Sequence, residues 1–564
     1  MLIHKLSDLS ELSGQGYETR TFGDLSIFLT GGARAMDSNW QRIDPLRQVA
    51  ERYASSGPRG CAEGLIGTYV LIIQDHDNIH VMSDHAGLRY VFYSEDIIST
   101  SFLSLASYMG INPAHDLDDF GCLEFIRFGS TSQGRTVFRH IRRLSGSVSL
   151  LLNRHTGKVV VVQQDIPLNQ CSNYPTSADA LELYLQNYAR CFDDESISID
   201  LTGGIDSRLN AVIFSSVGLS FETALSGTSD LKEISFAERV AQELGVPFVL
   251  SDYTPTKLAN DLEVLLSVTD GQCDVIAYDR LAKLARDRVS RGMRLSVSGT
   301  AGELLKDFWW IQDLPFWWSR KANIRRLYRL RMETITFPDH WMAEKYRNIN
   351  VTFVEKKIDE MSLLTQETNT KTYDMIYYRY RVPPIFGAFV SANARLGLRT
   401  ICPYLDPKVV KFGLEAPRLH RLAAGIHRGI ITRLRPEVGR IPTADGRRSR
   451  GGVLELFLSL PNITIDLSKR LIKKMAQRIV GKTYFQEASP SGDMASLNNQ
   501  VRERMIVALE ELRELGFIAK AATLDTIPSR FWGRLITMSL ILRGTRREND
   551  IHSGHPKSYR TASR

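Results

Sequence analysis

The sequence predicts an α/β protein built of two domains, and three observations support this prediction. The chain has 564 residues, more than one hydrophobic core usually serves, and 43% of them are hydrophobic, which is enough material for two cores. Its first 165 residues hold short strand-like runs separated by turn residues, which indicates a β-rich domain. After residue 180, strand-like and helix-like runs alternate, as they do in a doubly wound parallel sheet.

The first predicted domain, residues 1–165, takes its β character from five runs: GTYVLIIQD, IHVMSD, YVFYSED, GSVSLLLN and KVVVVQQD. The segment that follows, IPLNQCSNYPTSADA at 166–180, contains Pro, Asn and Ser without periodicity. Such a composition is typical of a linker. We therefore expect the domain boundary there.

The second predicted domain, residues 181–540, begins with the alternating pattern. SISIDL, FETALSG and VPFVLSD predict strands, residues 206–217 predict a helix closed by Gly218, and LKEISFAERVAQELG predicts a second helix. Beyond residue 315 the pattern is mostly helical, with Arg-rich amphipathic segments. The basic, polar residues 541–564 predict a disordered tail.

The cysteine pattern and the hydropathy of the chain indicate in which cellular compartment the protein resides. The six cysteines form no CxxC pair and no metal-like cluster, so the sequence predicts neither a disulfide frame nor a structural zinc. The start, MLIHKLSDLSELSG, lacks an apolar signal core, and no apolar run approaches the roughly 18 to 20 residues that span a bilayer. We expect a soluble, cytoplasmic protein.

The net charge of +8 allows two interpretations. Lys and Arg neutralise nucleic-acid phosphates, and a basic protein can bind nucleic acid for that reason. The alternative is a few basic surface stretches, notably RPEVGRIPTADGRRSRGG and the C-terminal tail. We favour the second interpretation and do not expect nucleic acid as a partner.

The stretch DLTGGIDSRLNAVIF, residues 200–214, holds the main functional signal. Gly203 and Gly204 let the chain turn sharply between a strand and a helix and expose backbone N–H groups, and the start of the helix adds its positive dipole end. Ser207 supplies a hydroxyl, and Asp206, which has the wrong charge for phosphate, indicates a mediating Mg²⁺. The alternative is a tight turn with Asp206 as N-cap.

Two other phosphate motifs are absent. Gly481, Lys482 and Thr483 end like a Walker loop, but the earlier glycine that the pattern needs is Ala476. The dinucleotide pattern GxGxxG is missing after the first strand of the second domain. LTGGIDS is therefore a phosphate loop of another type.

LTGGIDSR resembles the SGGxDS pyrophosphate loop of N-type ATP pyrophosphatases in the asparagine synthetase family. RLSVSGTAGELLKDFWW at 294–310 is similar to the family's SGxGxDE segment, with Glu303 in place of Asp, and CPYLDPKVVKFGLEAPRLHRL is similar to its PFLD segment. HRGIITRLRPEVGRIP matches the helix and turn that follow, and GLIGTYVLIIQDHDNIHVMSDHAGLRYVFYSED resembles the N-terminal meander. The ordered set covers most of the chain and resembles divergent members, such as lasso-peptide macrolactam synthetases and β-lactam synthetases.

The resemblance implies an Ntn-hydrolase-like N-terminal domain and an adenine nucleotide α-hydrolase-like synthetase domain. Family members use Mg-ATP to adenylate a carboxylate, release pyrophosphate, and let ammonia or an amine attack the acyl-adenylate. By this resemblance, Asp206 and Glu303 would hold Mg²⁺ and act in catalysis. The residues implied to bind ATP are Leu201, Thr202, Gly203, Gly204, Ile205, Asp206, Ser207, Leu225, Ser298 and Gly299.

The chain departs from the family at several positions. Family glutaminase domains use a cysteine at mature position two, but Leu2 stands here and the first cysteine is Cys61, so we expect no glutaminase activity. Arg399 replaces a glutamate four residues before the proline of the PFLD-like segment. The lysine with which the family stabilises adenylation is missing after the IP turn. Arg447 or Arg448 could supply the positive charge with a different geometry. The alternative is that this loop is only a solvated basic surface.

The helix YYRYR allows two interpretations, because Tyr377, Tyr378 and Arg379 could line an acceptor pocket or belong to the core, which we favour. The leading hypothesis is an ATP-dependent amide-forming ligase. Three versions of this chemistry remain open. The enzyme would use ammonia, or join a carboxylate to a peptide amine as a macrolactam synthetase does, or amidate a sugar acid. A substrate-delivery or maturation protein is a further partner to consider. A tRNA-modifying enzyme and an inactive, partner-binding paralogue remain alternatives.

Overall fold

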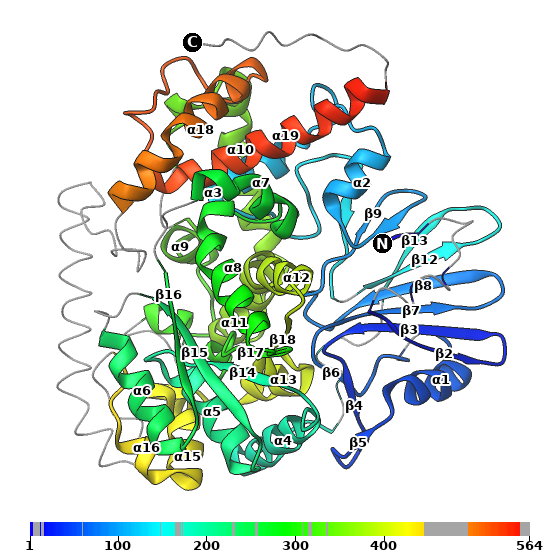
Figure 1. Cartoon of the computed structure of the whole chain (residues 1–564), viewed down its shortest axis with the longest axis vertical. Helices are drawn as coiled ribbons and strands as arrows, with labels where there is room; N and C mark the ends of the chain where they lie inside the picture. The colour runs from blue at the N-terminus through cyan, green and yellow to red at the C-terminus, as the bar shows by residue number, and fades with distance from the viewer. Residues whose placement is uncertain are drawn as a thin grey trace.

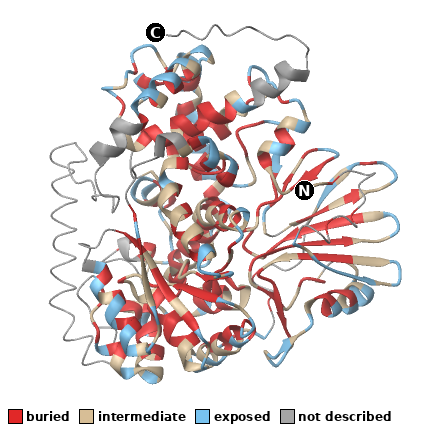
Figure 2. Ribbon diagram, in the orientation of Figure 1, coloured by how far each residue is buried: buried red, intermediate tan, exposed pale blue. Residues whose placement is uncertain are grey.

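The computed structural model describes residues 1–3, 16–58, 60–146, 148–163, 173–227, 232–253, 258–306, 308–313, 319–333, 337–444 and 494–552, with the single residues 9, 12, 168 and 171. Within these residues the protein is a mixed α/β molecule with one large antiparallel sheet and one parallel sheet (Figure 1). Figure 2 shows that the central strands of both sheets are mostly buried, whereas the edge strand β2 of the antiparallel sheet is exposed. No helix among the described residues is both long and apolar enough to cross a lipid bilayer.

The N-terminal part is built around a six-stranded antiparallel sheet in the order β13-β12-β8-β7-β3-β2. Apolar residues fill its central strands, so both faces are covered. Its strands are β2 (Glu18–Phe22), β3 (Leu25–Gly31), β7 (Tyr69–Gln74), β8 (Asn78–Ser83), β12 (Val148–Asn153) and β13 (Val159–Gln163). Four of the five strand-like runs of the sequence therefore form this sheet together with β2 and β3, whereas YVFYSED contributes β9 to a smaller sheet.

Two smaller sheets and three helices complete this part of the chain. The smaller sheets consist of β1 (Leu2–Ile3), β10 (Ile98–Ser99), β9 (Phe92–Tyr93) and β11 (Arg142–Arg143), and of β5 (Arg42–Ile43), β4 (Arg34–Met36) and β6 (Leu65–Ile66). The helices are α1 (Pro45–Ser56), α2 (Phe102–Tyr108) and α3 (Asp119–Phe128).

The parallel sheet has the order β16-β15-β14-β17-β18. From β14 the chain proceeds outward to β15 and β16, then returns to the other side of β14 to form β17 and β18, so the order reverses between β14 and β17. The carboxyl ends of the strands at such a reversal leave a crevice where ligands bind in α/β proteins. The strands are β14 (Ile197–Asp200), β15 (Phe221–Gly227), β16 (Phe248–Asp252), β17 (Leu295–Val297) and β18 (Arg399–Ile401).

Two groups of helices pack around this sheet. One group contains α4 (Ala178–Arg190), α5 (Ile205–Ser216), α6 (Lys232–Leu244), α15 (Gly425–Leu434) and α16 (Pro436–Arg440). The other contains α7 (Leu258–Thr269), α8 (Val275–Ser290) and α12 (Ala388–Arg395). Helix α4 begins inside the segment assigned to the linker, because Ser177 caps its N-terminus and accepts a hydrogen bond from Ala180 N.

Beyond residue 315 the described chain is helical apart from β18 and an isolated bridge, as the sequence predicts. The longer helices are α10 (Glu344–Ser362), α11 (Asn369–Ile376), α13 (Pro407–Glu415), α18 (Met494–Glu514), α19 (Trp532–His552) and the π-helix η7 (Tyr377–Gly387). The shorter ones are η3 (Gly302–Leu305), η4 (Trp309–Asp313), α9 (Ile324–Leu327), η5 (Tyr328–Met332), η6 (Asp339–Trp341), η8 (Pro403–Leu405), α14 (Arg418–Arg421), η9 (Leu422–Ala424) and η10 (Ser529–Phe531).

The predicted disordered tail is wrong for residues 541–552, because α19 continues to His552. Ile541 and Leu542 are buried, and Arg543 bonds Glu511 of α18 at 2.7 Å, so packing against α18 extends the helix into a polar sequence. Residues 553–564 lie outside the described part of the chain.

Candidate active site

Hydrogen bonds within the turn between β14 and α5 fix its shape, and no side chain caps the first N–H groups of α5. Ser207 Oγ accepts a hydrogen bond from Thr202 N at 3.1 Å, and Thr202 Oγ1 accepts one from Gly204 N at 3.1 Å. The N-cap of α5 is Gly204, not Asp206, and its lack of a side chain leaves α5 without a side-chain cap. The first N–H groups of α5 therefore face the crevice between β14 and β17 with the positive end of the helix dipole.

Gly203 is required where the turn meets the segment that follows α16. A Cβ at Gly203 would lie 2.8 Å from Ala444 Cβ, and the Gly203 carbonyl accepts a hydrogen bond from Ala444 N at 2.9 Å. The fully buried Arg208 fixes the same segment, since its guanidinium donates to Ile441 O at 2.6 Å and to Pro442 O at 3.0 Å. The predicted Arg447 and Arg448 lie just beyond this anchor, outside the described residues.

The turn after β17 packs directly onto the start of α5. A Cβ at Gly299 would lie 2.8 Å from Ser207 N, and one at Gly302 would lie 2.6 Å from the Asp206 carboxylate. Asn210 Nδ2 donates to Ser298 O at 3.0 Å, which ties the two elements together. The two loops that the sequence singles out, 201–207 and 298–303, therefore form one site.

Asp206 is the electrostatic centre of this site. Lys306 Nζ donates to Asp206 Oδ2, and His427 Nε2 of α15 lies 3.0 Å from Asp206 Oδ1. Burial by itself would raise the pKa of Asp206, but the charge of Lys306 and the contact with His427 lower it to about 2. Burial also lowers the pKa of His427, an effect that Asp206 opposes. Asp206 is therefore ionised at neutral pH.

Glu303 is the second carboxylate of the site. Tyr377 OH donates to Glu303 Oε2 at 3.0 Å. Burial, and then the negative charge of Asp206, raise the pKa of Glu303. Glu303 directly follows Gly302, which packs against the Asp206 carboxylate, and a divalent cation between the two carboxylates would remove this repulsion. The donor set thus fits Mg²⁺, which would share Asp206 with Lys306.

The remaining predicted residues take different places. Leu225 lies in β15, whose Ala224 carbonyl accepts a hydrogen bond from Leu201 N at 3.1 Å, so Leu201 and Leu225 lie near the carboxyl ends of β14 and β15, on the side of β14 away from β17. Arg399 does not reach the site, because it begins β18 at the amino end of the sheet and pairs with Glu195.

Tyr377 and Tyr378, at the start of η7, contact different parts of the molecule. Tyr377 reaches Glu303, whereas Tyr378 OH donates to His85 O at 3.3 Å in the N-terminal part, and Arg379 lies over the Tyr378 ring. The core interpretation therefore holds for Tyr378, and Tyr377, which is also buried, contacts a predicted catalytic residue.

Sequence reasoning missed Lys306, His427 and Tyr404, whose OH donates to Asp206 O at 2.9 Å. Lys306 directly follows the one-turn 3₁₀ helix η3 that contains Glu303, so its spacing from Glu303 was a usable signal. His427 and Tyr404 carry no local signal, since only the folding of α15 and η8 against α5 brings them to Asp206.

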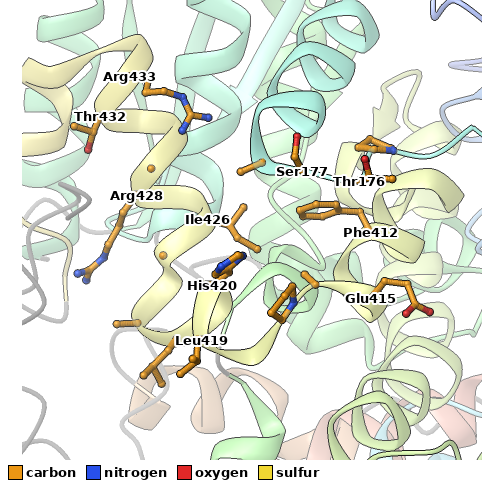
Figure 3. A pocket seen from close by; sticks show the side chains of 18 of the residues that line it. Thr176, Ser177, Phe412, Glu415, Leu419, His420, Ile426, Arg428, Thr432 and Arg433 are labelled. Atoms are coloured by element: carbon orange, nitrogen blue, oxygen red, sulfur yellow. The ribbon is translucent and has the colours of Figure 1, made fainter. Parts of the chain in front are cut away.

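A cavity of about 790 Å³ borders α15, the helix that carries His427. It is bounded by residues 174–178, α13, α14 and α15, and its lining is mostly apolar. Figure 3 shows Phe412, Ile426 and His420 around it, with Arg428 and Glu415 on opposite sides. Ile426 and Arg428 flank His427 in α15, so one helix borders both this cavity and Asp206.

All six cysteines are buried and unbridged. Cys61 is fully buried, its thiol donates to Pro58 O at 3.1 Å, and burial raises its pKa to about 12. Burial therefore disfavours the thiolate form, which is the nucleophilic form of a cysteine.

No curated protein matches the chain. Among solved structures, a match is found with the glutamine phosphoribosylpyrophosphate amidotransferase from B. subtilis complexed with ADP and GMP, at 12% identity over 41% of this chain and 47% of that one, with a TM-score of 0.15. The chain thus spans about half the length of that enzyme, and a likeness this low carries no argument.

The family model for asparagine synthase matches residues 185–489, a range that contains both loops of the site and the helices that bring Lys306 and His427 to them. The matched range is more than half of the 564 residues. Together with the paired loops at the reversal point of the parallel sheet, this match shows that the chain belongs to the asparagine synthase family.

Proposed function

We propose that the protein is an ATP-dependent carbon–nitrogen ligase that activates a carboxylate as an acyl-adenylate and then joins it to ammonia or an amine. The observation that carries the proposal is the position of Asp206, in the first turn of α5, beside Lys306 and behind the turn 202–204. Free N–H groups, a helix dipole and an ammonium group converge there, which suits the phosphates of a nucleotide.

The proposed chemistry is a displacement at the α-phosphorus of ATP. A carboxylate oxygen forms the new bond to phosphorus, the bond between the α- and β-phosphates breaks, and pyrophosphate leaves. Loop 201–207 and Lys306 would hold the phosphates that depart, while Leu201, Leu225, Ser298 and Gly299 would border the nucleoside. An amine then attacks the acyl carbon, and AMP leaves with one of the original carboxylate oxygens.

Asp206 and Glu303 are the residues that would hold Mg²⁺. When bound, the ion would neutralise negative charge on the phosphates as pyrophosphate forms. The chain's own contribution is to keep Asp206 ionised through Lys306 and to orient Glu303 through Tyr377. The Lys306 ammonium group already pairs with Asp206, which also favours a second candidate, an inactive paralogue in which Lys306 replaces the metal. Pyrophosphate release distinguishes the active enzyme from this paralogue.

The nitrogen source is proposed to be free ammonia or an amine, not glutamine. All six cysteines are buried, and burial raises the pKa of the Cys61 thiol, which supports a nitrogen source other than glutamine. The N-terminal sheet would then serve as a scaffold or a recognition surface in an Ntn-hydrolase-like domain. The mostly apolar cavity bordered by α15 offers space for a substrate larger than ammonia, which supports a peptide amine, as in a macrolactam synthetase, over a sugar acid.

Pyrophosphate release from Mg-ATP tests the proposal. Wild type, Asp206→Ala and the control Asp24→Ala, at an exposed turn of the antiparallel sheet, would each be given pools of carboxylates with ammonia or peptide amines, and glutamine alone. We expect release that requires a carboxylate, is lost in Asp206→Ala and is kept in Asp24→Ala. ATP binding without release from any pool would favour the inactive paralogue, and release that does not depend on Asp206 would refute the proposal.

A further inference from the structure

Two hairpin turns meet at one end of the antiparallel sheet. Strand β8 pairs with β12, with Asn78 opposite Asn153, so the turn between β7 and β8 lies beside the turn between β12 and β13 (Figure 1). The first turn carries His76 and Asp77, and the second carries His155. Both turns belong to the N-terminal part of the chain, and the proposed ligase chemistry uses neither.

Three potential metal ligands converge between these turns. His76 Nδ1 lies 2.7 Å from Asp77 Oδ1, and His155 Nε2 lies 2.8 Å from the same oxygen. The ligand atoms of all three side chains lie within 4.8 Å of one another.

The backbone around the three side chains is held in place before any ligand arrives. Asp75 Oδ1 accepts hydrogen bonds from Asp77 N at 3.0 Å and Asn78 N at 2.7 Å, which fixes the first turn. Asn153 Oδ1 accepts from His155 N at 3.2 Å and from Thr156 N, which fixes the second.

Arg154 joins the two turns to each other. Its backbone N donates to Asp77 O at 2.8 Å, and its guanidinium donates to His76 O at 3.2 Å. The three side chains therefore project from a rigid support, which lowers the entropy cost of bringing them around an ion.

From this arrangement we propose that His76, Asp77 and His155 form a binding site for a divalent transition-metal ion of the zinc type. Two imidazole nitrogens and one carboxylate oxygen are the ligands that Zn²⁺, Co²⁺, Ni²⁺ and Cu²⁺ prefer, whereas Mg²⁺ and Ca²⁺ prefer oxygen alone. Water would complete the coordination sphere, because the side chains are 85%, 56% and 65% exposed in the order His76, Asp77, His155.

The site needs little rearrangement to hold the ion. With metal–ligand bonds of about 2.0–2.1 Å, tetrahedral ligands stand roughly 3.3 Å apart. The present contacts of 2.7 and 2.8 Å would open by less than about 1 Å, and exposed side chains can make that shift without disturbing a core. Bound metal would link the β7–β8 turn to the β12–β13 turn.

The test is a titration of the purified full-length chain, without a histidine tag, with Zn²⁺ and with Co²⁺. Co²⁺ reports its geometry through visible absorption, and Zn²⁺ binding is followed by calorimetry. The variants are His155→Ala, His76→Ala and Asp77→Asn. His140→Ala is the matched control, because His140 is also exposed and lies 3.8 Å from Asp116, but without a third ligand.

We expect one tight ion per chain in the wild type and in His140→Ala. Each of the three site variants should weaken that binding by at least about 10-fold, as removal of a metal partner commonly does. Zn²⁺ should also raise the thermal unfolding midpoint of the wild type but not of His155→Ala. The proposal is overturned if the wild type binds no ion tightly, or if His155→Ala binds it as well as the wild type.

Discussion

At the scale of single residues, the candidate active site is organised by the carboxylate of Asp206. Lys306 and His427 approach it from two elements that are distant in the sequence, and together they keep its pKa at about 2 despite burial. Burial, and then the negative charge of Asp206, raise the pKa of Glu303. Lys306 is thus the residue that balances two neighbouring carboxylates.

Replacing Lys306 by Met should weaken the site without removing its side-chain bulk. A charge-assisted hydrogen bond contributes about 1.5–3 kcal/mol, so we expect pyrophosphate release to fall about 10- to 100-fold. Lys306→Arg should retain part of the activity. Lys283→Met, which removes an exposed ion pair with Asp287, is the control. Equal rates in Lys306→Met and wild type would exclude a role for Lys306 in phosphate binding.

At the scale of secondary-structure elements, the start of α15 is strained. Ala423 and Ala424 both have left-handed backbone conformations, with φ values of 51° and 57°, in the turn that sets the direction of the helix carrying His427. Non-glycine residues pay roughly 1–2 kcal/mol each for this conformation. The fold keeps the turn because α15 packs against α4 and α5.

Replacing Ala424 by Gly should therefore stabilise the protein by about 1 kcal/mol, since the relief of strain exceeds the added entropy of the unfolded chain. The measurement is the midpoint of urea unfolding. Ala54→Gly, at an exposed position within α1, is the control of opposite sign and should lower stability by about 0.5–1 kcal/mol. A lower midpoint for Ala424→Gly would contradict the account of this turn.

The sequence predicts three of the five strands of the parallel sheet, β14, β15 and β16, and the helices between them, but it predicts no strand at β18. FETALSG corresponds to β15 at Phe221–Gly227, and the helix expected at 206–217 is α5 at Ile205–Ser216. These elements have apolar patterns of the right period and glycines at their ends. The two loops of the site can be predicted because each directly follows a strand in the sequence. Lys306 and His427 depend on how distant elements pack, which no local pattern encodes.

At the scale of the whole molecule, each face of the antiparallel sheet has a core cluster of its own, whereas two other clusters cross between the two parts of the chain. One buried cluster joins Met36 and Leu88 to residues of the parallel-sheet region, and another joins Phe102 and Leu123 to α18 and α19. The sequence placed a boundary near residue 165 from composition, which does not report on packing across it. The order of strands within each sheet was likewise outside the reach of periodicity.

Polar contacts also cross between the two parts. Thr68 Oγ1 donates to Thr400 O at 2.5 Å, and Tyr90 OH donates to Pro383 O at 2.6 Å in η7, the helix that begins with Tyr377. His85 lies at the same interface, where its carbonyl accepts from Tyr378 OH. The N-terminal part is therefore a support for the helix that contacts Glu303.

His85 makes the folding stability of the protein depend on pH. Burial lowers the pKa of His85 to about 4, below the usual value near 6.5. Between these values the unfolded chain binds a proton that the folded chain does not, so stability falls as pH drops from about 6.5 to 4, by up to about 1.4 kcal/mol per pH unit.

Urea unfolding of wild type and His85→Gln at pH 7 and pH 5 measures this effect. We expect the variant to lose less stability on acidification, with a slope remaining from His80 and His427, whose pKa values burial also lowers. The exposed His140→Gln should behave like the wild type. An unchanged acid slope in His85→Gln would show that His85 is not the group responsible.

The central claim is that a carboxylate oxygen attacks the α-phosphorus of ATP, and heavy-oxygen transfer tests it most directly. The carboxylate pool that supports pyrophosphate release would be supplied with both carboxylate oxygens labelled, and the nucleotide product analysed by mass spectrometry. The account predicts AMP that carries one labelled oxygen, formed in wild type and absent in Asp206→Ala. Unlabelled AMP, or ADP as the nucleotide product, would contradict it.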